Sequence, residues 1–331
     1  MILSKPFGGE QEIANDGLHY GVTNSGRSSL RWIIQSMSLQ GKKVLVPDFL
    51  CQVVVDTLTD FGIEVGYYSV ETNFDFTLPD ALTQYDALYL VRYFGHDSKS
   101  LSERLTTSPI PLIIDDVFGV GAPSLKLNVQ WCYFNSLRKI STVTDYSEVV
   151  SNFPLRQIKK EALTLFADKK LRAKQKKYDY LNKGLGSESS YLDESNEAER
   201  LLNTTSSIYE PSDLGLVLSR KFYATLHTER QHHQSNHNIV NELLIDVDGI
   251  ELIEINSDFC SFQPILLENR DTVRKELFSH GAFLAVHWPE LVGVSNKLSG
   301  RILSIPLDSR YSNADIKALC RLLIEIHESI Q

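Results

Sequence analysis

Cysteine is scarce in this chain of 331 residues, and no long apolar run interrupts it. The cysteines lie far apart without a Cys-x-x-Cys pair, which excludes the usual spacing of a zinc site or a redox dithiol. We expect four free buried thiols: Cys51, Cys132, Cys260 and Cys320. No stretch approaches the length of a membrane span, and Met1-Ile2-Leu3-Ser4-Lys5 lacks the apolar core of a secretion signal. A cytoplasmic protein without membrane association is therefore expected.

An excess of basic residues is also lacking. Lys plus Arg number 33 against 42 Asp plus Glu, so the formal net charge is -9. Because phosphate neutralisation needs a dominant basic face, this charge argues against a general nucleic-acid binder. The hydrophobic content of 42% allows a substantial core, in two domains or in one large α/β unit.

The first half of the chain alternates amphipathic helical patterns with short apolar runs. This arrangement is typical of helices that cover both faces of a mostly parallel sheet. The expected helices are 27–38 and 53–61, and the expected strands are 43–47, 64–69, 87–93 and 112–115, with a further apolar strand from Trp131. Such short apolar runs suit parallel strands that are buried on both sides.

The second half predicts a long helix at 157–180, a mobile Ser/Glu/Gly-rich loop at 184–197, a helix at 214–244 and a final helix at 313–330. We expect a large domain at 15–215 and a smaller C-terminal α+β domain at 216–331, to which residues 1–14 also belong. The first of these helices carries the one marked basic run: Lys169, Lys170, Arg172, Lys174, Lys176 and Lys177. A solvated helix face is a better interpretation of that run than a nucleic-acid or lipid patch.

Small and hydroxyl residues stand where the first helix is expected to begin, in Asn24-Ser25-Gly26-Arg27-Ser28. A helix start exposes unpaired N–H groups and a positive dipole, so a phosphate can bind there with help from the Ser28 hydroxyl. Simple capping of the helix explains the same residues, and for this segment alone it is the favoured interpretation.

The apolar run at 112–114 ends in two acids, Asp115 and Asp116, before a glycine-bearing turn. Carboxylates at the carboxyl end of a central strand face the crevice where α/β proteins bind ligands. An Asp there can keep the pyridine nitrogen of pyridoxal phosphate (PLP) protonated. A magnesium site is the weaker alternative, because the chain contains no phosphate loop of the GxxxxGK type.

The strand from Trp131 leads into Ser136-Leu137-Arg138-Lys139. A lysine that leaves a strand into a pocket can form an imine with an aldehyde cofactor. Ser-x-x-Lys is also found in serine acyl-enzymes of the penicillin-binding class, but the accompanying Ser-Asp-Asn and Lys-Thr-Gly are absent.

With these three pieces in this order, the chain resembles PLP-dependent enzymes of fold type I, and among them the sugar aminotransferases of the DegT/StrS type. The resemblance runs through most of the chain. Its segments are Phe7-Gly8-Gly9-Glu10, 25–30, 44–47, 90–95, Gly121-Ala122, 136–139, His287-Trp288-Pro289 and 303–307. It implies a large domain with a mostly parallel sheet between helices, and a smaller C-terminal domain.

The resemblance also implies residue roles. Lys139 would be the Schiff-base lysine and Asp115 the partner of the pyridine nitrogen, with Asp116 as the fallback. Ser136 would contact the phosphate, as would the helix start at Gly26, Arg27 and Ser28. Phe118 would take the place of the Gln or His that packs on the ring.

Several positions depart from the family pattern. Cys51 stands where a ring-stacking Phe or Trp is common, although Phe49 or Phe118 could stack instead. After the lysine the family has Asp-Gly-Gly, whereas this chain has Asp145-Tyr146-Ser147. Close backbone approach is therefore less certain there.

By resemblance the protein is expected to transfer an amino group from glutamate to a keto sugar linked to a nucleotide, as a homodimer active in polysaccharide biosynthesis. A PLP-dependent sugar dehydratase, or a catalytically weakened homologue with a binding or structural role, remains as an alternative. A metal site at His233 and His237 is a weaker hypothesis, because their polar neighbours favour a solvated helix face.

Overall fold

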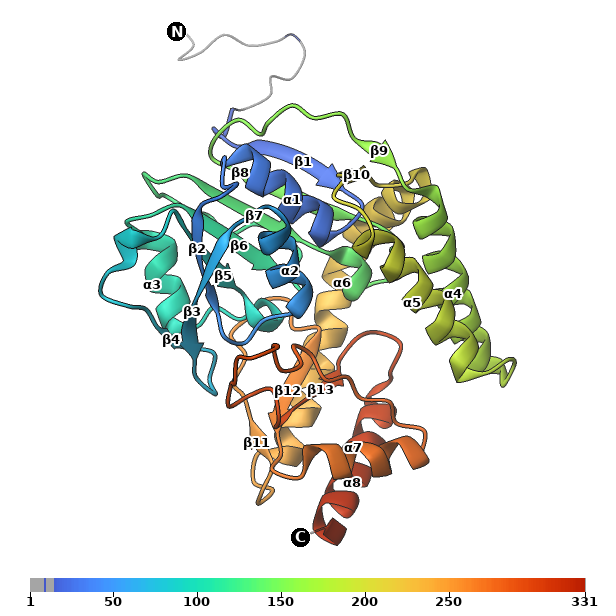
Figure 1. Ribbon diagram of the computed structural model, residues 1–331. Helices are drawn as coiled ribbons and strands as arrows, with labels where there is room; N and C mark the ends of the chain where they lie inside the picture. The colour runs from blue at the N-terminus through green and yellow to red at the C-terminus, as the bar shows by residue number, and fades with distance from the viewer. Residues whose placement is uncertain (1–8, 10–14, 331) are drawn as a thin grey trace, which may run out of the picture.

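The computed structural model describes residue 9 and residues 15–330, so Phe7, Gly8 and Glu10 of the family-like opening lie outside the described residues. Its larger part is built on an eight-stranded sheet of order β1-β8-β7-β6-β5-β2-β3-β4 (Figure 1). The strands are β1 His19–Thr23, β2 Lys43–Pro47, β3 Glu64–Val70, β4 Phe76–Thr77, β5 Ala87–Val91, β6 Leu112–Asp116, β7 Trp131–Asn135 and β8 Ser147–Ser151.

The centre of this sheet is parallel, as the short apolar runs predict. Strands β3, β2, β5, β6 and β7 pair in parallel, while β1, β8 and β4 join antiparallel at the edges. Every residue of β5, β6 and β7 is buried, which explains why these strands read as continuous apolar runs rather than as alternating patterns.

The two helices expected in the first half are confirmed to within two residues, as α1 Gly26–Ser36 and α2 Gln52–Asp60. A third helix, α3 Lys99–Thr107, was not predicted. Short 3-10 turns are η1 Leu82–Gln84, η2 Tyr93–Gly95 and η3 Leu137–Lys139. Figure 1 shows α1 and α2 in front of the sheet. The strand expected at 87–93 stops at Val91, because the chain then turns through η2, where Phe94 has a φ of 57°.

Two expectations for the middle of the chain are wrong. The helix expected at 157–180 is α4 Thr164–Lys183, and the residues before it include β9 Glu161–Ala162, which pairs with β10 Tyr209–Glu210. The loop expected at 184–197 is largely helix, α5 Glu188–Asn203. Its start is capped by the Ser187 side chain, which accepts from the backbone N–H of Ser190, and it packs along α4 around Phe166 and Leu202.

The smaller part follows the long helix α6 Asp213–Leu244, which runs from the large sheet to a second sheet (Figure 1). That antiparallel sheet contains β11 Glu251–Leu252, β12 Phe262–Leu266 and β13 Ile302–Pro306, with α7 Arg270–Ser279 and α8 Asn313–Ile330 beside it. The helices expected at 214–244 and 313–330 are confirmed, while the exact domain boundary stays a prediction. No helix within the described residues is both long and apolar enough to cross a membrane.

Candidate active site

The three segments singled out in the sequence converge at the carboxyl edge of the parallel strands. β6 and β7 are neighbours, with Asp115 opposite Phe134 in register, and η3 follows β7 directly. The start of α1 lies against the same strand end, because a Cβ added to Gly26 would lie 3.3 Å from the Phe134 ring. Asp115, Lys139 and the helix start therefore belong to one site.

The two consecutive acids lie on opposite faces of β6. Asp115 accepts a hydrogen bond of 2.6 Å from the Tyr89 hydroxyl, and burial raises its pKa against the opposing effects of Tyr89 and the Lys139 charge. Asp116 instead forms an ion pair of 2.6 Å with Arg92 on the other face, and burial raises its pKa to about 6. The acid that interacts electrostatically with Lys139 is therefore Asp115, and not the fallback Asp116.

Lys139 is partly exposed and lies among rings from both sheets. Its Nζ is 5.2 Å from the centroid of the Phe118 ring. His287 and Phe262, which reach the site from the smaller part, lie 4.9 and 5.6 Å from that ring, centroid to centroid. The His287 Nδ1 is 2.8 Å from the Ser304 hydroxyl, and burial, helped by the Lys139 charge, lowers the pKa of His287 to about 3. His287 is therefore neutral at pH 7.

Sequence patterns alone do not place His287 beside the lysine. His287 lies 148 positions further along the chain, in a segment held to β13 by a single bridge between Ala285 and Ser304. The sequence predicts only that His287-Trp288-Pro289 is a strand of the smaller domain. No local pattern distinguishes a strand residue that faces a distant lysine from one that faces solvent.

Cys51 lies beside the hydrogen-bond partner of Asp115. It precedes the first residue of α2 and is partly exposed. Burial is the main cause of the raised pKa of Tyr89, and the Asp115 charge and the Cys51 thiol add to it. Phe49 is fully buried against Tyr93, so the ring that lies next to Lys139 is Phe118.

The start of α1 combines capping with a possible anion site. The Ser25 Oγ accepts from the backbone N–H of Ser28, while the Ser28 Oγ donates to Asn24 at 2.8 Å. The Arg27 side chain reaches α5, where it contacts Glu199. Within the described residues, the buried Ser136 Oγ and Asn24 Nδ2 have no hydrogen-bond partner. These two polar groups can therefore donate hydrogen bonds to a ligand or to water.

Comparisons with solved structures decide the fold. At 16% identity and a TM-score of 0.64, the chain is similar to DesV from S. venezuelae, which was solved in complex with a ketimine intermediate; the match covers 94% of this chain and 85% of that one. It also resembles a DegT DnrJ EryC1 StrS aminotransferase from Brucella abortus (17% identity, TM-score 0.63, 93% and 86% covered). The chain is also similar to DesI, which was solved in the presence of its TDP-sugar product. That match has 15% identity and a TM-score of 0.63, and it covers 93% of this chain and 80% of that one.

The chain has the sugar aminotransferase fold. The expected architecture, that of PLP-dependent enzymes of fold type I, is thus confirmed. No family model and no curated protein matches the sequence, in keeping with the low identity to these structures.

The residues that replace the family's Asp-Gly-Gly have structural partners in this version of the fold. The Ser147 Oγ donates to the Asn135 carbonyl and lies 2.7 Å from the Ser29 hydroxyl. Asp145 accepts from the Ser212 backbone N–H at 2.6 Å, at the start of α6. Close backbone approach occurs instead at Gly215, where an added Cβ would lie 2.3 Å from the Asp145 carbonyl oxygen.

The solvated face expected for the histidine-rich helix holds for His232, which is exposed, but not for His233. His233 is buried, with its ring centroid 4.5 Å from that of Phe259, and His237 is partly buried. Among residues 9 and 15–330, no three His, Cys, Asp or Glu side chains form a group that could hold a metal ion.

The basic run also departs from a fully solvated face. Lys170 is buried and Lys174 is partly buried, because α5 covers this side of α4. Lys176, by contrast, forms an ion pair at the surface with Glu194.

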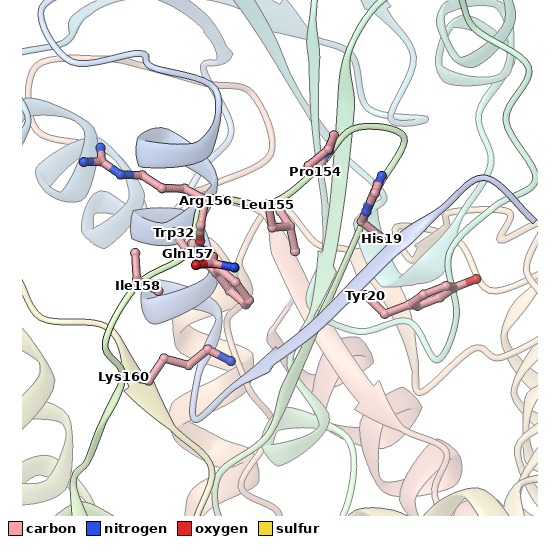
Figure 2. Close-up of a pocket in the computed structure, with 9 residues that line it drawn as sticks. All are labelled: His19, Tyr20, Trp32, Pro154, Leu155, Arg156, Gln157, Ile158 and Lys160. Carbon is pink, nitrogen blue, oxygen red and sulfur yellow. Dashed lines mark hydrogen bonds between the residues drawn. The ribbon is translucent and has the colours of Figure 1, made fainter. Parts of the chain in front are cut away.

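A separate open cavity of about 420 Å³ lies at the first residues of β1 (Figure 2). Its lining comes from β1, α1 and the segment after β8: His19, Tyr20, Trp32, Pro154, Leu155, Arg156, Gln157, Ile158 and Lys160. The Lys160 Nζ lies 4.4 Å above the Trp32 ring and donates to the Val22 carbonyl. None of the residues around Lys139 lines this cavity.

Proposed function

We propose that this protein is a PLP-dependent aminotransferase that moves an amino group from an amino acid, most simply glutamate, to a keto sugar linked to a nucleotide. The observation that carries the proposal is the placement of Lys139 and Asp115 at one strand edge, beside the start of α1. The TDP-sugar product seen with DesI supports a nucleotide-linked acceptor.

The donor groups at the site fit PLP. A buried carboxylate on the lysine side suits a protonated ring nitrogen, and the unpaired Ser136 hydroxyl suits a phosphate oxygen. Gly26 leaves room at the strand end that a side chain would fill, since its added Cβ would already touch Phe134. Bound PLP supplies an aldehyde that amines can attack and a ring that accepts electrons from the bond being broken.

Each site residue then has a defined task. Asp115 keeps a proton on the ring nitrogen, and Tyr89 fixes the orientation of its carboxylate. Lys139 would hold the cofactor through its aldehyde, and its amine would move a proton to and from the substrate carbon. Phe118 lies beside that amine and His287 packs on Phe118, and the neutral imidazole adds no positive charge there.

Arg27, Ser28 and Cys51 have less direct roles in this proposal. The Arg27 guanidinium is held by Glu199 and the Ser28 hydroxyl by Asn24, so the helix start offers the phosphate mainly backbone N–H groups. Cys51 has no aromatic ring to stack, and it precedes α2 as a partly exposed thiol. A homodimer and a cytoplasmic location remain part of the proposal as inferences from the resemblance.

A half reaction with glutamate tests the activity. The purified protein loaded with PLP should convert the cofactor to its pyridoxamine form when glutamate is added, and Lys139→Ala should not. A nucleotide-linked keto sugar should then restore the original absorbance. Tight PLP binding without any response to glutamate would contradict transamination and favour the weakened homologue. Sugar dehydration without amine transfer would favour the dehydratase.

A further inference from the structure

Three cationic side chains from three elements surround one carboxylate next to η3, and a fourth lies beside them. Glu199 on α5 contacts Arg27 from α1, Arg138 from η3 at 2.8 Å and Lys170 from α4 at 2.5 Å. The three cationic side chains are only 7–15% exposed. Lys174, one turn after Lys170, donates to the carbonyl oxygens of Arg138 at 3.3 Å and of Ser141 at 2.9 Å. We call Arg27, Arg138, Lys170 and Lys174 the cation cluster.

The cation cluster carries more positive charge than its single acid can balance. Burial raises the pKa of Glu199, but Arg138, Lys170 and Arg27 outweigh burial and hold that pKa well below its usual range. Burial, reinforced by the neighbouring Arg138 and Lys170, lowers the pKa of Lys174 to about 7. Because unbalanced charge away from water is unfavourable, an anion with more than one negative charge would stabilise this arrangement.

Unpaired donors in the same turn point to the same kind of ligand. Arg138 uses both terminal nitrogens on Glu199, and its Nε is buried without a partner among the described residues. The Ser136 Oγ, two residues earlier, is buried and unpaired as well. The start of α1, whose first N–H groups have no partner within the helix, lies against the strand that leads into this turn. A phosphate offers the several acceptor oxygens that these donors require.

We propose that the cation cluster is this chain's own site for the cofactor's phosphate. Ser136 and the Arg138 Nε donate to the phosphate, while Lys170 and Lys174 supply its countercharge. Glu199 is a positioning residue that holds the guanidinium groups of Arg27 and Arg138. The inference rests on the proposed function, since it assumes that PLP binds at Lys139.

Comparing PLP with pyridoxal, which lacks the phosphate, isolates the cluster. Dissociation constants of the full-length protein for both compounds are measured by equilibrium dialysis, for wild type, Lys174→Met and the control Lys176→Met. Wild type should bind PLP far more tightly than pyridoxal. Lys174→Met should weaken PLP binding roughly 10- to 100-fold, the usual loss for one hydrogen bond or contact with a charged group. Pyridoxal binding should change by less than about twofold, and Lys176→Met, a surface lysine on the same helix, should behave as wild type.

Three results would overturn the inference: equal weakening of PLP and pyridoxal by Lys174→Met, no effect of that variant on either, or equal affinity of wild type for both compounds. Equal weakening would mean that Lys174 only supports the turn that carries Lys139. If Lys174→Met fails to fold, Lys170→Met with the control Lys169→Met gives the same comparison. If wild type binds neither compound, the proposed function fails together with the inference. If both bind equally and glutamate converts the cofactor, only the cluster inference fails.

Discussion

Substituting the two neighbouring acids separately tests which of them serves the site. Asp115→Asn removes the negative charge that interacts with the Lys139 charge, while Asp116→Asn removes the one that pairs with Arg92 on the opposite face of β6. Two unit charges about 4 Å apart at an effective dielectric constant of about 20 interact by about 4 kcal/mol. If Asp115 stabilises the ring charge by that amount, Asp115→Asn should lower kcat about 1,000-fold.

Asp116→Asn is the matched control. It weakens a buried ion pair, so the free energy of unfolding should fall by roughly 3 kcal/mol. The loss of stability should be no larger than this, because Arg92 retains its ion pair with Asp97, which accepts a hydrogen bond from the Arg92 Nε at 2.8 Å. The activity of the folded fraction should stay within about tenfold of wild type, since this carboxylate lies on the other face of β6.

Single-turnover rates with glutamate, and denaturant unfolding of the same samples, give both quantities. The reasoning would be refuted if Asp116→Asn lost more activity per folded molecule than Asp115→Asn. Equal, small losses in both variants would also contradict the assignment of Asp115 to the ring nitrogen.

Further predictions concern the frame around the site. Gly215→Ala should lower the free energy of unfolding by at least about 2 kcal/mol, because its Cβ would lie 2.3 Å from the Asp145 carbonyl oxygen. The control Ala224→Gly, at an exposed position of the same helix, should cost only about 1 kcal/mol; a loss at Gly215 no larger than that in chemical unfolding would contradict the clash. Ser187→Ala should lower the free energy of unfolding by about 1 kcal/mol, because α5 loses its N-terminal cap. An unchanged free energy in denaturant unfolding would contradict a stabilising role of this cap. Lys174 faces Arg138, Lys170, Lys177 and Arg310, and its pKa is about 7 when folded against 10.5 when unfolded. Between pH 7 and 10.5 the unfolded state therefore binds more protons than the folded state, so the free energy of unfolding without cofactor should rise with pH from about 7 to 10. Urea titrations at pH 7 and 9 measure this rise, and Lys174→Met should make it smaller.

Much of the fold could be predicted because the central parallel strands β5, β6 and β7 are short and buried along their whole length, so their sequences are largely apolar. The polar residues of the site stand at the carboxyl ends of two of them: Asp115 is near the end of β6, and Ser136 directly follows β7. The α5 helix was missed because its many Ser and Glu residues resemble a loop. Its helical state depends on the Ser187 cap and on pairing of Glu194 with the lysines of α4.

Only part of the candidate site could be predicted from the sequence. The order of the motifs along the chain predicted that the helix start, the strand ending in acids and the lysine share one site. It could not separate Asp115 from Asp116, because that choice depends on which strand face meets Lys139. The Glu199 contact with Arg27, 172 positions apart, and the approach of His287 to Phe118 are tertiary contacts without a local pattern.

Borohydride reduction of the PLP-loaded protein, followed by peptide mass spectrometry, shows which lysine holds the cofactor. The reduced cofactor should be attached to the Lys139 side chain, and Lys139→Ala should yield no labelled peptide. Attachment to Lys174 or another lysine, or no label at all with excess PLP, would contradict this assignment.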